Sequence, residues 1–175
     1  APWVDGNATR WFRYDRIRKY NNFLEKIEAV EMDADKKERY KAEVRFLRAY
    51  DYYSKIMYYG DVPLVDKVIT SAEEANLSRT PKAEVEDFVL KELEEVAALL
   101  PVQNTIESGG HITKGAAIAL KARLELYLGK YEQAQASAET VINMPCYELY
   151  ADYEEMFWPS AESSNKEAIL DVQYM

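Results

Sequence analysis

The sequence has few of the residues that build metal centres and disulfide frameworks. Its 175 residues include one cysteine, Cys146, and one histidine, His111. A lone cysteine excludes an internal disulfide and a cysteine-based zinc site, and a lone histidine excludes a metal site built on a histidine pair. No third group is evident that would orient Cys146 and His111 as a catalytic pair. We therefore expect no cofactor, no metal and no nucleophilic catalysis.

Long apolar runs and excess positive charge are also missing. No stretch approaches the ~18 consecutive apolar residues of a membrane-spanning helix. Lysine and arginine total 22 against 31 aspartates and glutamates, so the formal net charge is -9. This balance repels phosphate backbones, and no basic stripe with interleaved aromatic residues offsets it. The composition therefore argues against nucleic acid as a partner.

Aromatic residues are abundant instead, with 14 tyrosines and 3 tryptophans. Tyrosine and tryptophan combine a flat apolar face with a polar tip. That combination suits half-buried seams between helices, and it also suits sugar-binding surfaces. For any single tyrosine, packing between helices is the simpler interpretation.

Apolar residues recur at helical spacing in five segments, which predicts five amphipathic helices. In the second segment we expect Leu47 and Tyr50 on the buried face. Thr80 and Thr113 are expected N-caps, and Gly60 is expected to end the second helix. The five predicted helices span residues 9–28, 35–59, 81–100, 114–129 and 130–143.

The last two predicted helices form a tight antiparallel hairpin of the kind found in tetratricopeptide repeats. Gly129 supplies the turn, Ala134 and Ala138 permit close crossing of the helices, and Pro145 follows the second helix. Both alanines are therefore expected to lie at the helix contact.

The segments 36–59 and 81–100 resemble a degenerate copy of this hairpin, joined by the long connector 60–80. Such hairpins bury their apolar faces by stacking on one another. We predict an all-α fold of antiparallel hairpins stacked as tetratricopeptide-like repeats.

Residues 144–175 differ from the helical part. They are predicted to be irregular except for 167–174, whose period-two alternation indicates a strand. An unpaired strand edge is a liability, so we expect the natural chain either to continue past Met175 or to pair this strand with a partner that is missing here. Residues 1–175 are interpreted as a single helical domain, a fragment of a longer chain.

Several motifs occur in the order seen in one known family. Residues 42–53 (AEVRFLRAYDYY) resemble its AEARFLRAYYY helix, and Gly60 to Leu64 match its GDVPL turn. Together these matches resemble the SusD/RagB family over nearly the whole chain after Arg10. His111 is a departure, because the family usually has arginine there, so an ion pair made by that arginine is not expected here. The other matching segments are 14–25, 110–117, 127–131, 147–149, 156–157 and 165–170.

The resemblance implies a lipoprotein on the outer face of the bacterial outer membrane. Such proteins bind an oligosaccharide, or in some members a peptide, and cover a TonB-dependent transporter barrel. They bind and deliver a nutrient and perform no covalent chemistry. Family members are about three times longer, so the lipid-bearing cysteine and the ligand-rich C-terminal half are expected to lie outside this chain.

The residues within the matching motifs have two interpretations. Charged residues of the second helix, such as Arg45, and Asp61 of the turn are either ligand contacts or structural groups. Ion pairing between helices and turn formation are the simpler interpretations. The residues assigned a structural role are Glu43, Arg45, Leu47, Arg48, Tyr50, Gly60, Asp61, Pro63, Gly129, Ala134 and Ala138.

Trp3, Asp5 and Asn7 are the candidate ligand-binding residues. They precede the first helix in a segment without periodicity, and they combine a flat face for a pyranose with polar groups for its hydroxyls. The alternative is a ragged terminus. Trp158 is a weaker candidate, because the Phe157-Trp158 pair would also suit a core plug.

Two other functions compete with nutrient binding. A tetratricopeptide-type module whose concave face binds another protein would share the same fold. A small glycoside hydrolase would need two carboxylates across a cleft, and the adjacent pairs Glu94-Glu95 and Glu154-Glu155 do not provide that separation. We interpret these acids as solvated surface and expect no enzymatic activity.

Overall fold

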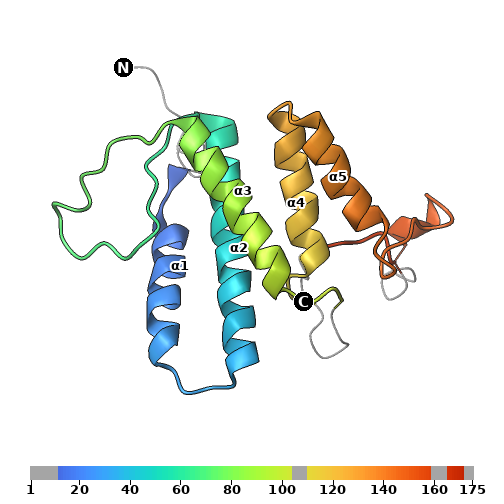
Figure 1. Cartoon of the computed structure of the whole chain (residues 1–175), viewed down its shortest axis with the longest axis horizontal. Coiled ribbons are helices and arrows are strands. Elements are labelled where there is room, and N and C mark those ends of the chain that lie inside the picture. The colour runs from blue at the N-terminus through green and yellow to red at the C-terminus, as the bar shows by residue number, and fades with distance from the viewer. Residues whose placement is uncertain (1–11, 104–109, 159–164, 172–175) are drawn as a thin grey trace. The chain divides into compact units, whose positions relative to one another are not determined.

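The computed structural model describes residues 12–103, 110–158 and 165–171 (Figure 1). Regular structure in these residues is helical, which confirms the all-α prediction. Two compact units form, one within residues 1–96 and one within residues 97–175. That residues 1–175 make a single domain stays a prediction. The elements are α1 (Asp15–Lys26), η2 (Ile27–Ala29), α2 (Ala34–Tyr59), α3 (Lys82–Leu99), α4 (Lys114–Tyr127), α5 (Tyr131–Ile142) and η4 (Glu155–Phe157).

In the first unit, α1 and α2 lie side by side as an antiparallel pair (Figure 1). Asp33 caps α2, because its Oδ1 accepts from the Lys36 backbone N–H at 2.9 Å. Gly60 ends α2 with a φ of 68°, a left-handed conformation that glycine adopts without strain, so the predicted stop is confirmed. The predicted start of the first helix near Thr9 is wrong: Arg13 and Tyr14 are not helical, and α1 begins at Asp15.

α2 and α3 contact each other in antiparallel order. The Tyr52 and Phe88 rings meet edge to face with centroids 5.7 Å apart, and Arg48 Nη2 lies 2.8 Å from Glu92 Oε2. These contacts confirm the predicted pairing of segment 36–59 with segment 81–100. They also make α2 the central helix of this unit, because α1 packs on it as well.

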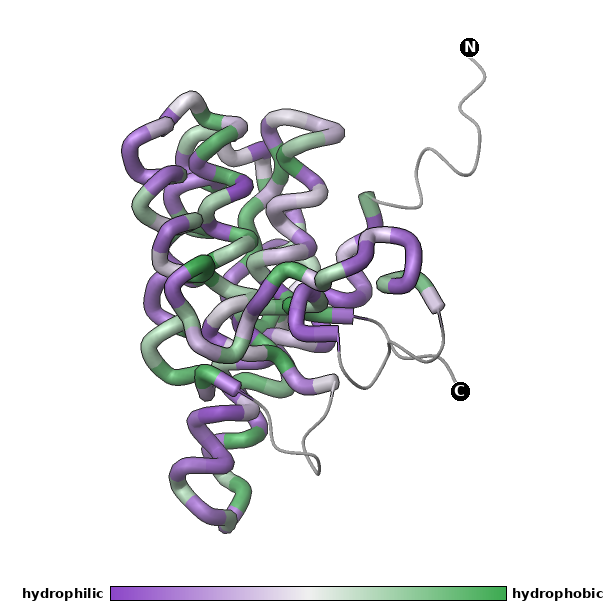
Figure 2. Tube along the Cα trace, turned by 90° about the vertical axis from the view of Figure 1, so that its right-hand side faces the viewer, coloured by the Kyte–Doolittle hydropathy of each residue, from purple (hydrophilic) through white to green (hydrophobic). Residues whose placement is uncertain are grey.

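The buried face of α2 differs from the prediction. Leu47 and Tyr50 are 38% and 47% exposed, whereas Phe46 and Tyr52 are 3% and 0% exposed. The prediction followed the large apolar residues, but the true face includes alanines and two cationic side chains that find polar partners. Figure 2 shows that hydrophilic and hydrophobic residues alternate within single turns along the helices in general. The buried residues of α2 are Ala42, Phe46, Arg48, Ala49, Tyr52, Lys55 and Ile56.

The connector between α2 and α3 is fixed at both ends. Val62 and Thr80 form an isolated antiparallel bridge. The Thr80 hydroxyl accepts from the Leu64 backbone N–H at 3.2 Å, so the expectation that Thr80 caps α3 is wrong. Asp61 provides the acceptor instead, because its Oδ1 takes the Lys82 backbone N–H at 2.8 Å. The cap thus comes from the far end of the connector, which sequence spacing does not reveal.

In the second unit, α4 and α5 form the predicted hairpin. Thr113 caps α4 by accepting from the Ala116 backbone N–H at 3.3 Å, as expected. Gly129 makes the turn with a φ of 72°. Ala134 is buried and Ala138 is half-buried, which agrees with close packing on this face of α5.

The predicted strand at 167–174 is wrong for the part that the structure describes. Residues 167–171 form turns and bends, and 172–174 lie outside the described residues. Polar contacts join this segment to residues 148–150: Lys166 Nζ pairs with Glu148 at 3.2 Å, and Glu167 Oε2 accepts from the Tyr150 N–H at 3.0 Å. Alternation alone does not make a strand when no partner supplies a ladder.

Candidate functional site

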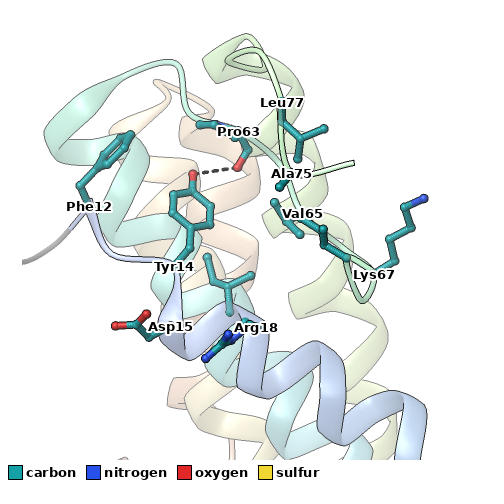
Figure 3. Close-up of a pocket in the computed structure, with 11 residues that line it drawn as sticks. Phe12, Tyr14, Asp15, Arg18, Pro63, Val65, Lys67, Ala75 and Leu77 are labelled. Atoms are coloured by element: carbon teal, nitrogen blue, oxygen red, sulfur yellow. Dashed lines mark hydrogen bonds between the residues drawn. The ribbon is translucent and has the colours of Figure 1, made fainter. Parts of the chain in front are cut away.

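A cavity of about 480 Å³ lies in the first unit, between the start of α1 and the connector (Figure 3). Its volume falls within the range of small-molecule sites. Most of its walls are apolar, and charged side chains from both segments also line it. The lining residues are Phe12, Tyr14, Asp15, Ile17, Arg18, Pro63, Val65, Lys67, Ile69, Ala75 and Leu77.

Side chains of the helices hold the connector wall by its backbone carbonyls. The Tyr14 hydroxyl donates to the Pro63 carbonyl at 2.8 Å (Figure 3). Asn21 Nδ2 donates to the carbonyls of Val65 and Lys67 at 3.0 and 2.9 Å. The Tyr52 hydroxyl accepts from the Val65 N–H at 2.7 Å. Because buried polar backbone groups need partners, these bonds fix the path of a segment without regular structure.

Arg48 joins this wall to α3. Its Nη1 donates to Asn21 Oδ1 at 2.8 Å and to the Asp66 carbonyl at 3.0 Å, and its Nη2 donates to Glu92 Oε2 at 2.8 Å. Arg48 and Glu92 are both buried. A buried charge pair is costly to desolvate and costlier still to break. Arg48 therefore positions the connector through its bond to the Asp66 carbonyl. It is not one of the residues that line the cavity.

Tyr14 is held from two sides and lines the cavity. Beyond its bond to Pro63, its ring lies 5.1 Å from Lys55 Nζ, a cation–π contact. Lys55 Nζ also donates to the Arg13 carbonyl at 2.8 Å. Burial raises the pKa of Tyr14 to about 12, against an opposing effect of Arg79. The phenol is therefore neutral at physiological pH and acts as a fixed hydrogen-bond donor.

The sequence-predicted ligand residues are only partly described. Trp3, Asp5 and Asn7 lie outside the described residues. Trp158 follows η4 and is 51% exposed, so it does not plug a core. Phe157, its neighbour, is 68% exposed and contacts the Tyr153 ring edge to face at 5.4 Å. Trp158 thus stands in a small group of exposed aromatic side chains in the second unit.

The motif residues of α2 make ion pairs. Glu43 pairs with Arg39 at 3.0 Å. Arg45 pairs with Glu92 at 2.6 Å and also with Glu95. The pairs of Arg45 and Arg48 join α2 to α3, in agreement with a role in positioning neighbouring helices. The Glu43 pair lies within α2, so that role for Glu43 stays a prediction. Gly60, Asp61 and Pro63 likewise hold the turn and the connector, as the backbone angles and hydrogen bonds given above establish.

Sequence reasoning did not find the cavity. Its walls come from segments about fifty residues apart, and the connector has no periodicity to indicate which of its side chains face α1. One signal was present: Tyr14 and the Gly60–Leu64 turn both belong to motifs of the same family. A hydrogen bond from the Tyr14 hydroxyl to the Pro63 carbonyl brings the two motifs into contact.

The described residues hold neither a metal-binding cluster nor a membrane-spanning helix. Among them, no group of three or more histidine, cysteine, aspartate or glutamate side chains is arranged to hold a metal ion. Within that same part of the chain, none of the helices combines the length and the apolar character needed to cross a membrane.

Residues 3–128 match the model of a SusD-like family described as starch-binding and associating with the outer membrane. The match covers well over half of the chain. The chain therefore belongs to this SusD-like family, and the family description associates it with the outer membrane.

Individual relatives agree with this assignment. SusD-like protein P2 of Formosa agariphila is 27% identical over 166 residues, which are 93% of this chain and 32% of that protein. The crystal structure of a SusD-like carbohydrate binding protein from Bacteroides fragilis has a TM-score of 0.88 at 32% identity and covers 95% of this chain. A laminarin binding SusD-like protein has a TM-score of 0.81 at 29% identity and covers 88% of this chain.

The helical arrangement is thus that of the SusD-like proteins. This chain spans about a third of the length of these relatives: 32% of protein P2, 33% of the Bacteroides fragilis protein and 34% of the laminarin binding protein.

Proposed function

We propose that this protein binds an oligosaccharide at the outer surface of a bacterium and delivers it to a TonB-dependent transporter. The observation that carries the proposal is the family match over residues 3–128, because the family is described as starch-binding and outer-membrane-associated. The structural likeness to a carbohydrate binding protein and a laminarin binding protein supports the same class of ligand. We also propose that a lipid anchor holds the protein at that surface.

Trp3, Asp5 and Asn7 are the residues we propose for sugar contact, with Trp158 as a second platform. An indole offers the apolar face on which a pyranose stacks, and carboxylate and amide groups bond its hydroxyls. The exposure of Trp158, Phe157 and Tyr153 supports a role for this aromatic group in binding. Covering these aromatic side chains with a ligand is favourable, because it removes apolar surface from water.

The proposed role is binding without covalent chemistry. A glycosidase needs a carboxyl group whose pKa is raised, so that it donates a proton near neutral pH. Hydrogen bonding to Arg45 lowers the pKa of Glu95 instead. The Glu94-Glu95 pair therefore does not provide the acid that such a reaction requires.

A second candidate is a protein-binding module of the tetratricopeptide type. The exposed apolar side chains of α2 favour it, because Leu47, Tyr50 and Met57 face solvent in the structure. A module of this kind would bind an apolar helix or peptide rather than a sugar.

Affinity electrophoresis of the chain through gels that contain single polysaccharides separates the two candidates. We expect retardation by at least one neutral or acidic glycan, with bovine serum albumin as the non-binding control. Unchanged mobility in every gel would contradict the proposed function and leave the protein-binding module as the better account. Protease shaving of intact cells that produce the protein tests its surface location separately.

A further inference from the structure

The cavity beside α1 has the properties of a preformed ligand site. Its connector wall is held by hydrogen bonds that Tyr14 and Asn21 donate and that Tyr52 accepts, so its shape does not depend on an occupant. Its interior is lined by Ile17, Val65 and other apolar side chains. A preformed site avoids the entropy cost of ordering its walls when a ligand binds.

Cations outnumber carboxylates among the residues that line this cavity, in contrast to the protein as a whole. Arg18 and Lys67 line it, and the Arg79 guanidinium lies 6.0 Å from the Phe12 ring, itself a lining residue. Within the described residues, no hydrogen bond or ion pair involves the Arg18 side chain. The net charge of the whole chain is -9. A guanidinium without a side-chain partner among the described residues, on an acidic protein, marks a place where a negative group is favoured.

Two carboxylates near the cavity are ion-paired, Asp15 with Arg13 and Glu74 with Lys67. Asp15, the one carboxylate among the lining residues, pairs with Arg13 at 3.2 Å. Lys67 is itself ion-paired: the Glu74 carboxylate lies 3.6 Å from its Nζ and also accepts from the Thr70 N–H at 2.9 Å. The guanidinium of Arg18 therefore remains available for an anion that enters the cavity.

We propose that this cavity binds an anionic pyranose unit, carboxylated or sulfated, within an oligosaccharide. The apolar walls and the Tyr14 ring would contact the C–H face of the sugar, and the Arg18 guanidinium would bond its acid group. The proposal rests on the proposed glycan-binding function and adds to it the chemical class of one sugar unit and the site that takes it.

Amide-resolved NMR titration tests this on the ¹⁵N-labelled chain. The probes are a galacturonic acid trisaccharide, a sulfated galactose oligosaccharide and neutral galactotriose, at constant ionic strength. We expect an anionic probe to shift the amides of 12–18 and 63–77 and to saturate at a lower concentration than galactotriose. The two anionic probes distinguish a carboxylate from a sulfate site.

Three variants locate the effect. Arg18→Gln is expected to weaken binding of the anionic probe about tenfold, the scale of a lost charge-assisted hydrogen bond. Ala75→Leu fills the cavity from its exposed connector wall and is expected to abolish the shifts at 12–18. Lys19→Gln, an exposed charge on α1 outside the cavity, is the matched control and should leave binding within about twofold.

The outcomes separate this inference from the proposed function. Shifts confined to other amides, equal affinity for neutral and anionic probes, or insensitivity to both Arg18→Gln and Ala75→Leu would overturn the inference. In each of these cases a glycan still binds, so the proposed function stands. The absence of any shift with any of the three probes would overturn the inference, and retardation in the polysaccharide gels would then decide the proposed function by itself.

Discussion

The Tyr147 ring occupies the space directly beside Gly115, the second residue of α4. A Cβ built on Gly115 would overlap the Tyr147 hydroxyl and the ring atoms next to it. The Tyr147 hydroxyl also lies 3.0 Å from the Thr113 hydroxyl, which caps the same helix. Tyr147, which follows α5, thus leaves no room for a side chain at residue 115. This contact joins the segment after the hairpin to the start of α4.

Gly115→Ala should therefore lower the free energy of unfolding by ~1–3 kcal/mol, the usual cost of overpacking. Chemical denaturation measures this loss. In a Tyr147→Ala background the overlap is gone, and the same change should be neutral or stabilising by up to ~1 kcal/mol, because alanine is the better helix former. An equal loss in both backgrounds would show that the two residues are not coupled.

Substitution of Glu92 tests whether its pair with Arg48 helps to position the connector. Glu92→Gln leaves Arg48 as a buried cation without its carboxylate, and the expected cost is ~3–5 kcal/mol in urea unfolding. Lys91→Gln, on the same helix but with an exposed side chain, is the control and should change stability by less than ~0.5 kcal/mol. A loss below ~1 kcal/mol for Glu92→Gln would mean that the connector does not depend on this pair.

Truncation of two neighbouring residues of α2 tests which face of this helix is buried. Phe46→Ala should cost ~3–5 kcal/mol because Phe46 is buried. Leu47→Ala, its exposed neighbour, should cost less than ~1 kcal/mol. Thermal or urea unfolding of both variants checks this order. A larger loss of stability for Leu47→Ala would show that the face predicted from the sequence is the buried one.

Alkaline pH should destabilise the first unit through its tyrosines. Burial raises the pKa of Tyr14 and of Tyr20 from 10.0 to about 12. The folded state therefore retains these protons between about pH 10 and 12, where the unfolded state loses them. Stability from this source is complete below pH 10 and is lost as pH rises towards 12.

Tyr14→Phe should accordingly reduce the decline in melting temperature between pH 9 and pH 12, although it lowers stability at pH 9 by the loss of the bond to Pro63. Melting curves across this range check the difference in slope, and Tyr58→Phe, at an exposed tyrosine, is the control. Parallel declines for wild type and Tyr14→Phe would show that Tyr14 does not titrate with folding.

The sequence predicted the helices better than their contacts. Capping by Thr113 and the stops at Gly60 and Gly129 were predictable because they depend on neighbouring residues only. The buried face of α2 was not predictable, because Ala42 and Ala49 carry little hydrophobic signal and the burial of Arg48 depends on Glu92, 44 residues away. The cavity was missed for the same reason, since its walls meet only in the folded chain.

The strand expected at 167–174 shows the limit of periodicity as evidence. Alternation indicates which side chains share a face if a strand forms, but a strand also needs a partner for its backbone groups. Residues 165–167 bond to residues 148–150 through side chains and one long backbone contact of 3.4 Å instead. The described part of this segment consequently has no regular structure.

Isothermal titration calorimetry of the full-length protein and of its Trp3→Ala variant against a glycan panel tests the central claim most directly. We predict a measurable heat of binding for at least one glycan, its loss in Trp3→Ala, and a melting temperature that Trp3→Ala leaves almost unchanged. A lower melting temperature with intact binding would remove Trp3 from the site. No heat of binding with any glycan would contradict the account of this chain as a glycan-binding protein.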